Sequence, residues 1–133
     1  RYVVHMTVFF LGSLGIENLF ERWENLLNKN ELEQLEEECF SELDNQASRA
    51  QALFYLARMN EEKGQFETAH TFSAELISLV HNEETYMLHG RVCFNLNNLQ
   101  DAITTFSAIL DSQPQHVDAL YFLSQIKESF FEN

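Results

Sequence analysis

The chain has 133 residues, 45% of them hydrophobic, which is enough to bury one core and predicts a single domain. Its 21 acidic and 8 basic residues give a net charge of −13, and no basic stripe offsets it. A surface of that sign repels phosphate backbones and anionic lipid headgroups, so we expect neither nucleic-acid binding nor direct membrane binding by the folded domain. The single Pro and four Gly are sparse helix breakers and predict an all-helical protein.

The two cysteines, Cys39 and Cys93, lie far apart and belong to no CxxC motif or recognised Cys/His spacing. We interpret them as small buried apolar residues rather than as a disulfide or a metal site. A chain with so few cysteines fits a reducing compartment, so the cytoplasm is the expected location. The alternative is a periplasmic protein, or one anchored in a membrane through a segment N-terminal to this chain.

Residues 1–16 form an apolar segment. The run 3–14 is too short to span a membrane and is interrupted by His5 and Thr7. We interpret the segment as a helix or strand that covers one open end of the fold. A remnant of a membrane anchor is the alternative, and residues 1–6 also fit a vector-derived start.

From residue 16 onward, apolar residues recur at spacings of three and four, which is the period of an amphipathic helix. The pattern predicts a helix over 16–27 and a second over 30–43, the latter beginning at Asn30. Further helices are predicted at about 49–63, 66–80, 84–96, 99–112 and 117–131. Gly64 and Asn97 mark turns, since both adopt a left-handed backbone easily. Asn82 and Asn98 stand where helix N-caps are needed.

The second half of the chain carries one residue pattern twice, 33 residues apart. Each copy places a large residue, a small residue, a turn, an aromatic or Leu, an Ala and a closing aliphatic at the same offsets. The first copy is Leu53, Leu56, Ala57, Gly64, Phe66, Ala69 and Leu76, and the second is Tyr86, His89, Gly90, Asn97, Leu99, Ala102 and Ile109. A fixed period of this length predicts a solenoid, in which each unit buries its apolar face against its neighbours. Such an array favours a surface that holds another molecule.

These residues resemble the tetratricopeptide repeat, a helix–turn–helix unit of about 34 residues. The match is closest from Glu83, where it is carried by Tyr86, His89, Gly90, Cys93, Asn97, Leu99, Ala102, Phe106, Ile109 and Pro114. The resemblance implies an all-α, right-handed α–α superhelix of helical hairpins with a C-terminal capping helix. It divides residues 17–133 into a degenerate repeat (17–49), two repeats (50–82 and 83–116) and the capping helix (117–133). Small residues such as Gly90 and Ala102 would let the two helices of a repeat approach closely.

In this family the first helices of successive repeats line a concave groove that binds extended or helical peptides. The resemblance implies a partner-binding groove formed by Phe54, Arg58, Met87, Arg91, Phe94, Tyr121 and Gln125. Arg58 and Arg91 fall in one row, a repeat apart, and their guanidinium groups suit a partner's carboxylates or carbonyls. The aromatic residues and the methionine of the set would take its apolar side chains. The alternative is that both arginines pair with glutamates of the same chain, namely Glu61, Glu62 or Glu84.

The sequence carries no recognisable catalytic motif or metal-binding motif. The five histidines (His5, His70, His81, His89 and His116) are scattered without an HExxH motif or a His–Cys cluster, and no phosphate-binding loop is present. His89 lies at a core position of its repeat and is interpreted as a structural imidazole. We therefore expect no enzymatic activity, no cofactor and no metal.

The sequence thus predicts a protein–protein interaction module, an adaptor or assembly scaffold that binds a peptide or helical segment of a partner in its groove. Two alternatives stay open. One is a chaperone of the secretion type, which holds an aggregation-prone client. The other is a structural segment that self-associates, or stacks on a larger protein, through the apolar residues at 3–14 and 130–131.

Overall fold

The computed structural model describes residues 17–132, with side chains over 19–130, and within this range it contains seven α-helices and no strand. In chain order these are α2 (Glu17–Asn28), α3 (Leu32–Glu42), α4 (Arg49–Glu62), α5 (Phe66–Leu79), α6 (Glu83–Asn95), α7 (Leu99–Ser112) and α8 (Val117–Glu132). The all-α prediction is confirmed for this range. No helix in it is both long enough and apolar enough to cross a membrane. The interpretations given to residues 1–16 and to the side chain of Phe131 lie outside the described residues.

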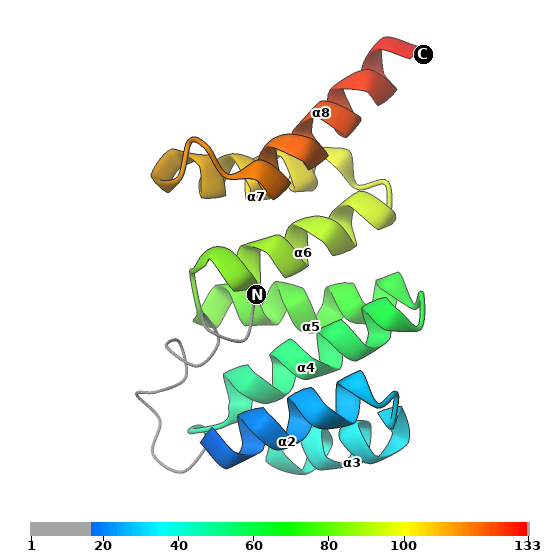
Figure 1. The fold of residues 1–133 in the computed structure, drawn as a ribbon, viewed down its shortest axis with the longest axis vertical. Coiled ribbons are helices and arrows are strands. Elements are labelled where there is room, and N and C mark those ends of the chain that lie inside the picture. Colours follow the sequence, from blue (N-terminus) through cyan, green and yellow to red (C-terminus); the bar gives the residue numbers. More distant parts are fainter. Residues whose placement is uncertain (1–16, 133) are drawn as a thin grey trace.

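Each helix packs on the next helix of the chain, so the elements stack in sequence order along the long axis of the molecule (Figure 1). The most extensive contacts join α4 with α5 and α6 with α7, which are the two hairpins that the 33-residue period predicts. The first helices also contact one another in succession, α2 with α4, α4 with α6 and α6 with α8. Contacts between near neighbours are what a repeat sequence requires, because each unit is covered by the next.

The turns follow from a few residues with special backbone preferences. Gly64 has a φ of 74° and Asn97 a φ of 61°, so both predicted left-handed turns are confirmed. Asn82 is confirmed as the cap of α6. Its Oδ1 accepts from the N–H of Thr85 at 3.0 Å, while Thr85 Oγ1 accepts from the N–H of Asn82 at 3.3 Å. This reciprocal capping box satisfies two backbone donors at the helix start.

Asn30 differs from the prediction, and Asn98 takes the predicted position without making a side-chain capping bond. Asn30 has a φ of 60°, and it closes α2 in a left-handed turn instead of starting the next helix. Helix α3 begins at Leu32 after an N-cap, Glu31, that makes no side-chain capping bond. Asn98 does stand at the N-cap of α7, but its side-chain amide donates to the carboxylate of Asp101 at 2.9 Å.

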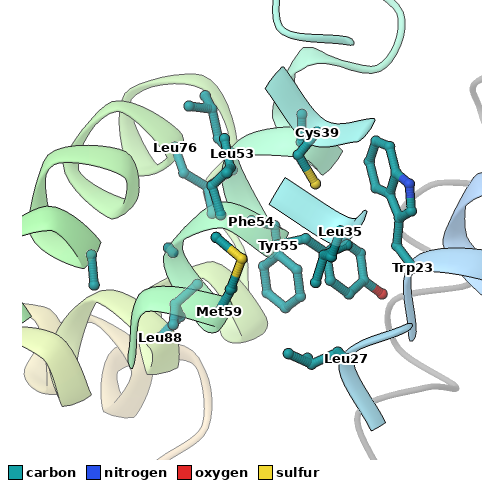
Figure 2. Close-up of a cluster of buried hydrophobic side chains, with 14 of the residues drawn as sticks. Trp23, Leu27, Leu35, Cys39, Leu53, Phe54, Tyr55, Met59, Leu76 and Leu88 are labelled. Carbon is teal, nitrogen blue, oxygen red and sulfur yellow. The ribbon is translucent and has the colours of Figure 1, made fainter. Parts of the chain in front are cut away.

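The larger of two core clusters gathers side chains of α2 to α5 and one side of α6 (Figure 2). Tyr55 is fully buried in it, and its ring makes edge contacts with Phe20, Trp23 and Phe54 at centroid distances of 6.4, 5.9 and 5.2 Å. The Tyr55 hydroxyl donates to Glu24 Oε1 at 2.7 Å, so the buried phenol has a partner. Large rings that also satisfy their polar atoms contribute strongly to core stability.

The second cluster fills the space between the other side of α6, α7 and α8. Phe106 is fully buried there, and its ring stacks on Phe122 with centroids 5.0 Å apart and an interplanar angle of 2°. Gly90 lies against the same ring, so closely that an added Cβ would be 2.6 Å from Phe106 Cε1. The close packing of α6 on α7 therefore requires the small residue that the sequence pattern places at position 90.

Candidate functional site

The two arginines of the predicted groove, Arg58 and Arg91, both form ion pairs with glutamates of this chain. Arg58 Nη1 lies 2.9 Å from Glu24 Oε1. Arg91 donates to both oxygens of Glu61, from Nε at 2.7 Å and from Nη2 at 3.0 Å. Each carboxylate comes from the first helix of the preceding pair, so the two ion pairs connect α2 to α4 and α4 to α6. Glu61 was among the expected partners, whereas Glu24 becomes a neighbour only through helix packing.

Two apolar residues of the predicted groove are buried. Phe54 is 3% exposed and Met87 is 1% exposed. The guanidinium of Arg58 covers the Phe54 ring, with Cζ 5.7 Å from the ring centroid. A cavity of about 10 Å³ between Phe54, Arg58, Glu84 and Arg91 has room for about one water molecule. Between α4 and α6, therefore, the predicted groove residues that face this cavity are a buried ring and charged side chains.

The remaining groove residues lie together where α6 meets α8. Tyr121 is 57% exposed, while Phe94 and Gln125 are half-buried. Phe122 lies between the two aromatic residues, with ring centroids 5.3 Å from Phe94 and 5.5 Å from Tyr121. Edge-to-face contacts of this kind hold rings in defined orientations. Phe94, Phe122 and Tyr121 thus form a partly exposed group of aromatic rings at this end of the predicted groove.

The same helix carries further exposed apolar side chains. Helix α8 packs on α7 and α6, and Figure 1 shows its C-terminal part projecting from the stack. Val117 is 76% exposed, Leu120 43% and Tyr121 57%, and helical spacing places the three on one face. We call these three residues, together with Phe94 and Gln125, the α8 patch. Exposed apolar groups gathered in one place are typical of interaction sites.

Three side chains with metal-ligating atoms meet between α5 and α6: His70, His89 and Cys93. One ligand atom of each lies within 4.8 Å of the other two. His89 Nε2 is 3.5 Å from Cys93 Sγ, and the rings of His70 and His89 have centroids 5.2 Å apart. His89 and Cys93 are buried and His70 is half-buried. The expectation that the chain contains no His–Cys cluster is therefore wrong.

Part of this cluster could have been found in the sequence. His89 and Cys93 are four residues apart, and on a helix this spacing places two side chains on one face. His70 belongs to the preceding helix, and its approach depends on how α5 packs against α6. A single sequence shows the first relation but not the second.

Burial determines the charge state of the cluster. It lowers the pKa of His89 to about 4, with a further contribution from nearby His70. It also raises the pKa of the Cys93 thiol to about 11, and the carboxylate of Asp101 acts in the same direction. At neutral pH the His89 imidazole and the Cys93 thiol are consequently both neutral, because neither charged form is solvated in the core.

A separate polar network connects α2 to α3. The carboxylate of Glu38 accepts hydrogen bonds from Arg22 Nε at 2.7 Å, from Trp23 Nε1 at 3.0 Å and from Gln34 Nε2 at 2.6 Å. The hydrogen bond from Arg22, supported by those from Gln34 and Trp23, lowers the pKa of Glu38 to about 2. Hydrogen bonds to the ionised carboxylate favour that form. This network is structural, since it joins two helices at the first hairpin.

Comparison of the chain with protein-family models, with curated proteins and with solved structures finds no match in any of the three. The resemblance to the tetratricopeptide repeat therefore depends on the residues quoted above and on the hairpins at α4–α5 and α6–α7.

Proposed function

We propose that this chain is a protein–protein interaction module, an adaptor or assembly scaffold built of tetratricopeptide-like hairpins, and that it binds a peptide or helical segment of a partner protein. The observation that carries the proposal is the α8 patch. It lies at one end of the row α2, α4, α6 and α8, in which each helix contacts the next. The proposal includes the right-handed superhelical course of the array and its concave face along these first helices.

The chemistry of the patch suits an apolar or aromatic anchor of a partner. Tyr121 offers a large, half-exposed ring with a hydroxyl, and such amphipathic rings are enriched at binding hot spots. The Tyr121 ring makes an edge contact with Phe122, and a ring already in contact loses less side-chain freedom when a partner binds. Gln125 supplies a side-chain amide that can pair with a peptide backbone.

In this proposal the ion pairs of Arg58 and Arg91 stabilise the relative positions of α2, α4 and α6. A partner's carboxylate could reach Arg58 or Arg91 only by displacing Glu24 or Glu61. Partly buried, charge-assisted pairs that join successive first helices keep the surface in one shape. The version of the groove hypothesis in which Arg58 and Arg91 bind a partner's carboxylates is accordingly the less favoured one.

We keep the cytoplasm as the proposed compartment. Both cysteines of the described chain are free thiols in buried positions. Thiols that persist unpaired are typical of reducing compartments.

The test places a photo-crosslinking amino acid at Tyr121 and, as a matched control, at Thr104, an exposed residue of the second helix α7. We expect a distinct crosslinked partner from position 121, identified by mass spectrometry and absent from position 104. A Tyr121→Glu variant with an unchanged unfolding transition should lose that partner. Equal capture from both positions, or binding that survives the substitution, would place recognition elsewhere and refute the proposed site. A crosslink to a second copy of the chain would instead establish self-association.

A further inference from the structure

The cluster of His70, His89 and Cys93 has the dimensions of a zinc site. Tetrahedral zinc binds imidazole nitrogen at about 2.0–2.1 Å and thiolate sulfur at about 2.3 Å, so a nitrogen and a sulfur ligand lie about 3.5 Å apart. His89 Nε2 and Cys93 Sγ are separated by 3.5 Å, which is one edge of that tetrahedron. All three ligand atoms lie within 4.8 Å of one another. Small side-chain rotations would therefore close the remaining distances.

A contact with Ser73 suits His89 as a metal ligand. Ser73 Oγ donates to the backbone carbonyl of His70 at 3.4 Å and lies 2.8 Å from His89 Nδ1. With an ion bound at Nε2, the ring proton of His89 would reside on Nδ1 and would donate to Ser73 Oγ across this 2.8 Å contact. The lone pair of Nε2 would then face the ion beside Cys93. Histidines that bind metals are usually held in this way, with the other ring nitrogen donating to a nearby acceptor.

The helices hold these groups in place and leave one side accessible. His89 and Cys93 are one turn apart on α6, a helix buried along most of its length. Helix α5, which supplies His70, packs extensively against α6. His70 is the half-buried member of the three, so its side of the cluster is where an ion would arrive. The mixture of imidazole and thiolate ligands favours zinc over calcium or magnesium, which prefer oxygen.

We propose that His70, His89 and Cys93 bind Zn²⁺, with water or an external ligand completing the tetrahedron. On binding, the thiol proton of Cys93 is released to solvent and a sulfur–zinc bond takes its place. Since His70 belongs to one hairpin and the other two ligands to the next, the ion joins the α4–α5 unit to the α6–α7 unit. This inference is independent of the proposed partner-binding function.

The first experiment adds Co²⁺, a spectroscopic substitute for zinc, to the reduced, chelator-treated chain. We expect one Co²⁺ per chain, with a thiolate-to-cobalt charge-transfer band and the intense visible bands of tetrahedral cobalt, all abolished by added Zn²⁺. The melting temperature should rise with Zn²⁺ concentration, because an ion held only by the folded chain stabilises it by mass action. Absence of these bands at saturating Co²⁺, or bands of octahedral cobalt without sulfur, would overturn the proposal.

Variants assign the ligands. Cys93→Ala should abolish the charge-transfer band, and His70→Gln, at a half-buried position, should weaken Co²⁺ binding while the protein remains folded. Ser73→Ala leaves all three ligands in place and should weaken binding about 10- to 100-fold through loss of the imidazole's hydrogen bond.

The matched controls are the other buried cysteine, Cys39→Ala, and an exposed histidine, His81→Gln. Both should bind Co²⁺ as the wild type does. Retention of the charge-transfer band in Cys93→Ala, or its loss in Cys39→Ala, would place the metal elsewhere. Unchanged affinity in a folded His70→Gln protein would remove His70 from the site and overturn the three-ligand proposal.

Discussion

Replacement of Gly90 by Ala should destabilise the protein, although Ala normally strengthens a helix. The added Cβ would lie 2.6 Å from Cε1 and 2.7 Å from Cζ of Phe106. Non-bonded carbons prefer about 3.5–4.0 Å, so roughly 1 Å of overlap must be relieved. The Phe106 ring is fully buried and stacked on Phe122, and it cannot retreat without moving α8.

The expected magnitude is the difference between two opposing terms. Overpacking of a tight core costs about 1–3 kcal/mol. Ala gains about 0.8–1.0 kcal/mol over Gly in a helix interior. The difference is about 0–2 kcal/mol. Because Phe106 is fully buried and stacked on Phe122, we expect the upper half of that range, a loss of about 1–2 kcal/mol of unfolding free energy or about 4–8 °C in melting temperature for a domain of this size. Gly90→Leu adds further atoms at the same point and should separate α6 from α7.

The assay is urea and thermal unfolding followed by circular dichroism, with a double-mutant cycle to Phe106→Leu. A smaller side chain at 106 makes room for the new methyl group, so the two changes should couple by about 1 kcal/mol or more. Gly64→Ala is the control, because no atom lies within 4 Å of an added Cβ and its φ of 74° causes strain by itself. Gly64→Ala should therefore be additive with Phe106→Leu. A Gly90→Ala protein as stable as the wild type would refute this account of the α6–α7 packing.

Two further predictions concern helices α2, α3 and α4. Glu38 has a folded-state pKa of about 2, below its ordinary value of 4.5, so its ionised form stabilises the native state above about pH 4.5 and this contribution is lost as the pH falls towards 2. The unfolding free energy, measured from pH 6 to pH 2.5, should fall less steeply with decreasing pH for Glu38→Gln than for the wild type. Tyr55→Phe deletes a charge-assisted hydrogen bond to Glu24 in a fully buried position, and denaturant titration should show a loss of about 1.5–3 kcal/mol.

Each of these two predictions has a matched control. Glu37 is an exposed carboxylate on the same helix as Glu38. Glu37→Gln should leave the fall of unfolding free energy between pH 6 and pH 2.5 unchanged. Tyr86 makes its hydroxyl contact with His81 at 3.0 Å on the surface, so Tyr86→Phe should cost much less than Tyr55→Phe. If Glu38→Gln and Glu37→Gln reduced this pH dependence equally, the hydrogen bonds to Glu38 would not be the cause of its low pKa. A Tyr55→Phe protein of wild-type stability would show that the buried hydroxyl contributes nothing.

Local features of this protein could be read from the order of its residues. The three-and-four spacing of apolar residues predicts every described helix to within about two residues, because burial of one helix face needs only that period. Gly64, Asn97 and Asn82 act where the sequence places them, since turn and cap geometry depends on a few adjacent residues. Asn30 shows the limit of such reasoning. A residue that suits a cap also suits a left-handed helix end, and here the second applies.

The candidate sites depend on contacts between helices. Arg58 and Arg91 lie in one row as the repeat register predicts, but their carboxylate partners come from other helices and follow from the α2–α4 and α4–α6 contacts. The burial of Phe54 and Met87 has the same origin.

The residue order alone determined the helices, their turns, the 33-residue period and the need for a small residue at Gly90, because each depends on neighbours in the chain or on one repeated offset. The tertiary structure decided which side chains remain exposed and which groups meet, as at the α8 patch and at His70, His89 and Cys93. The reason is geometric. A helix face is defined within one segment, whereas the approach of His70 to α6 depends on how α5 packs against α6, which no single segment encodes.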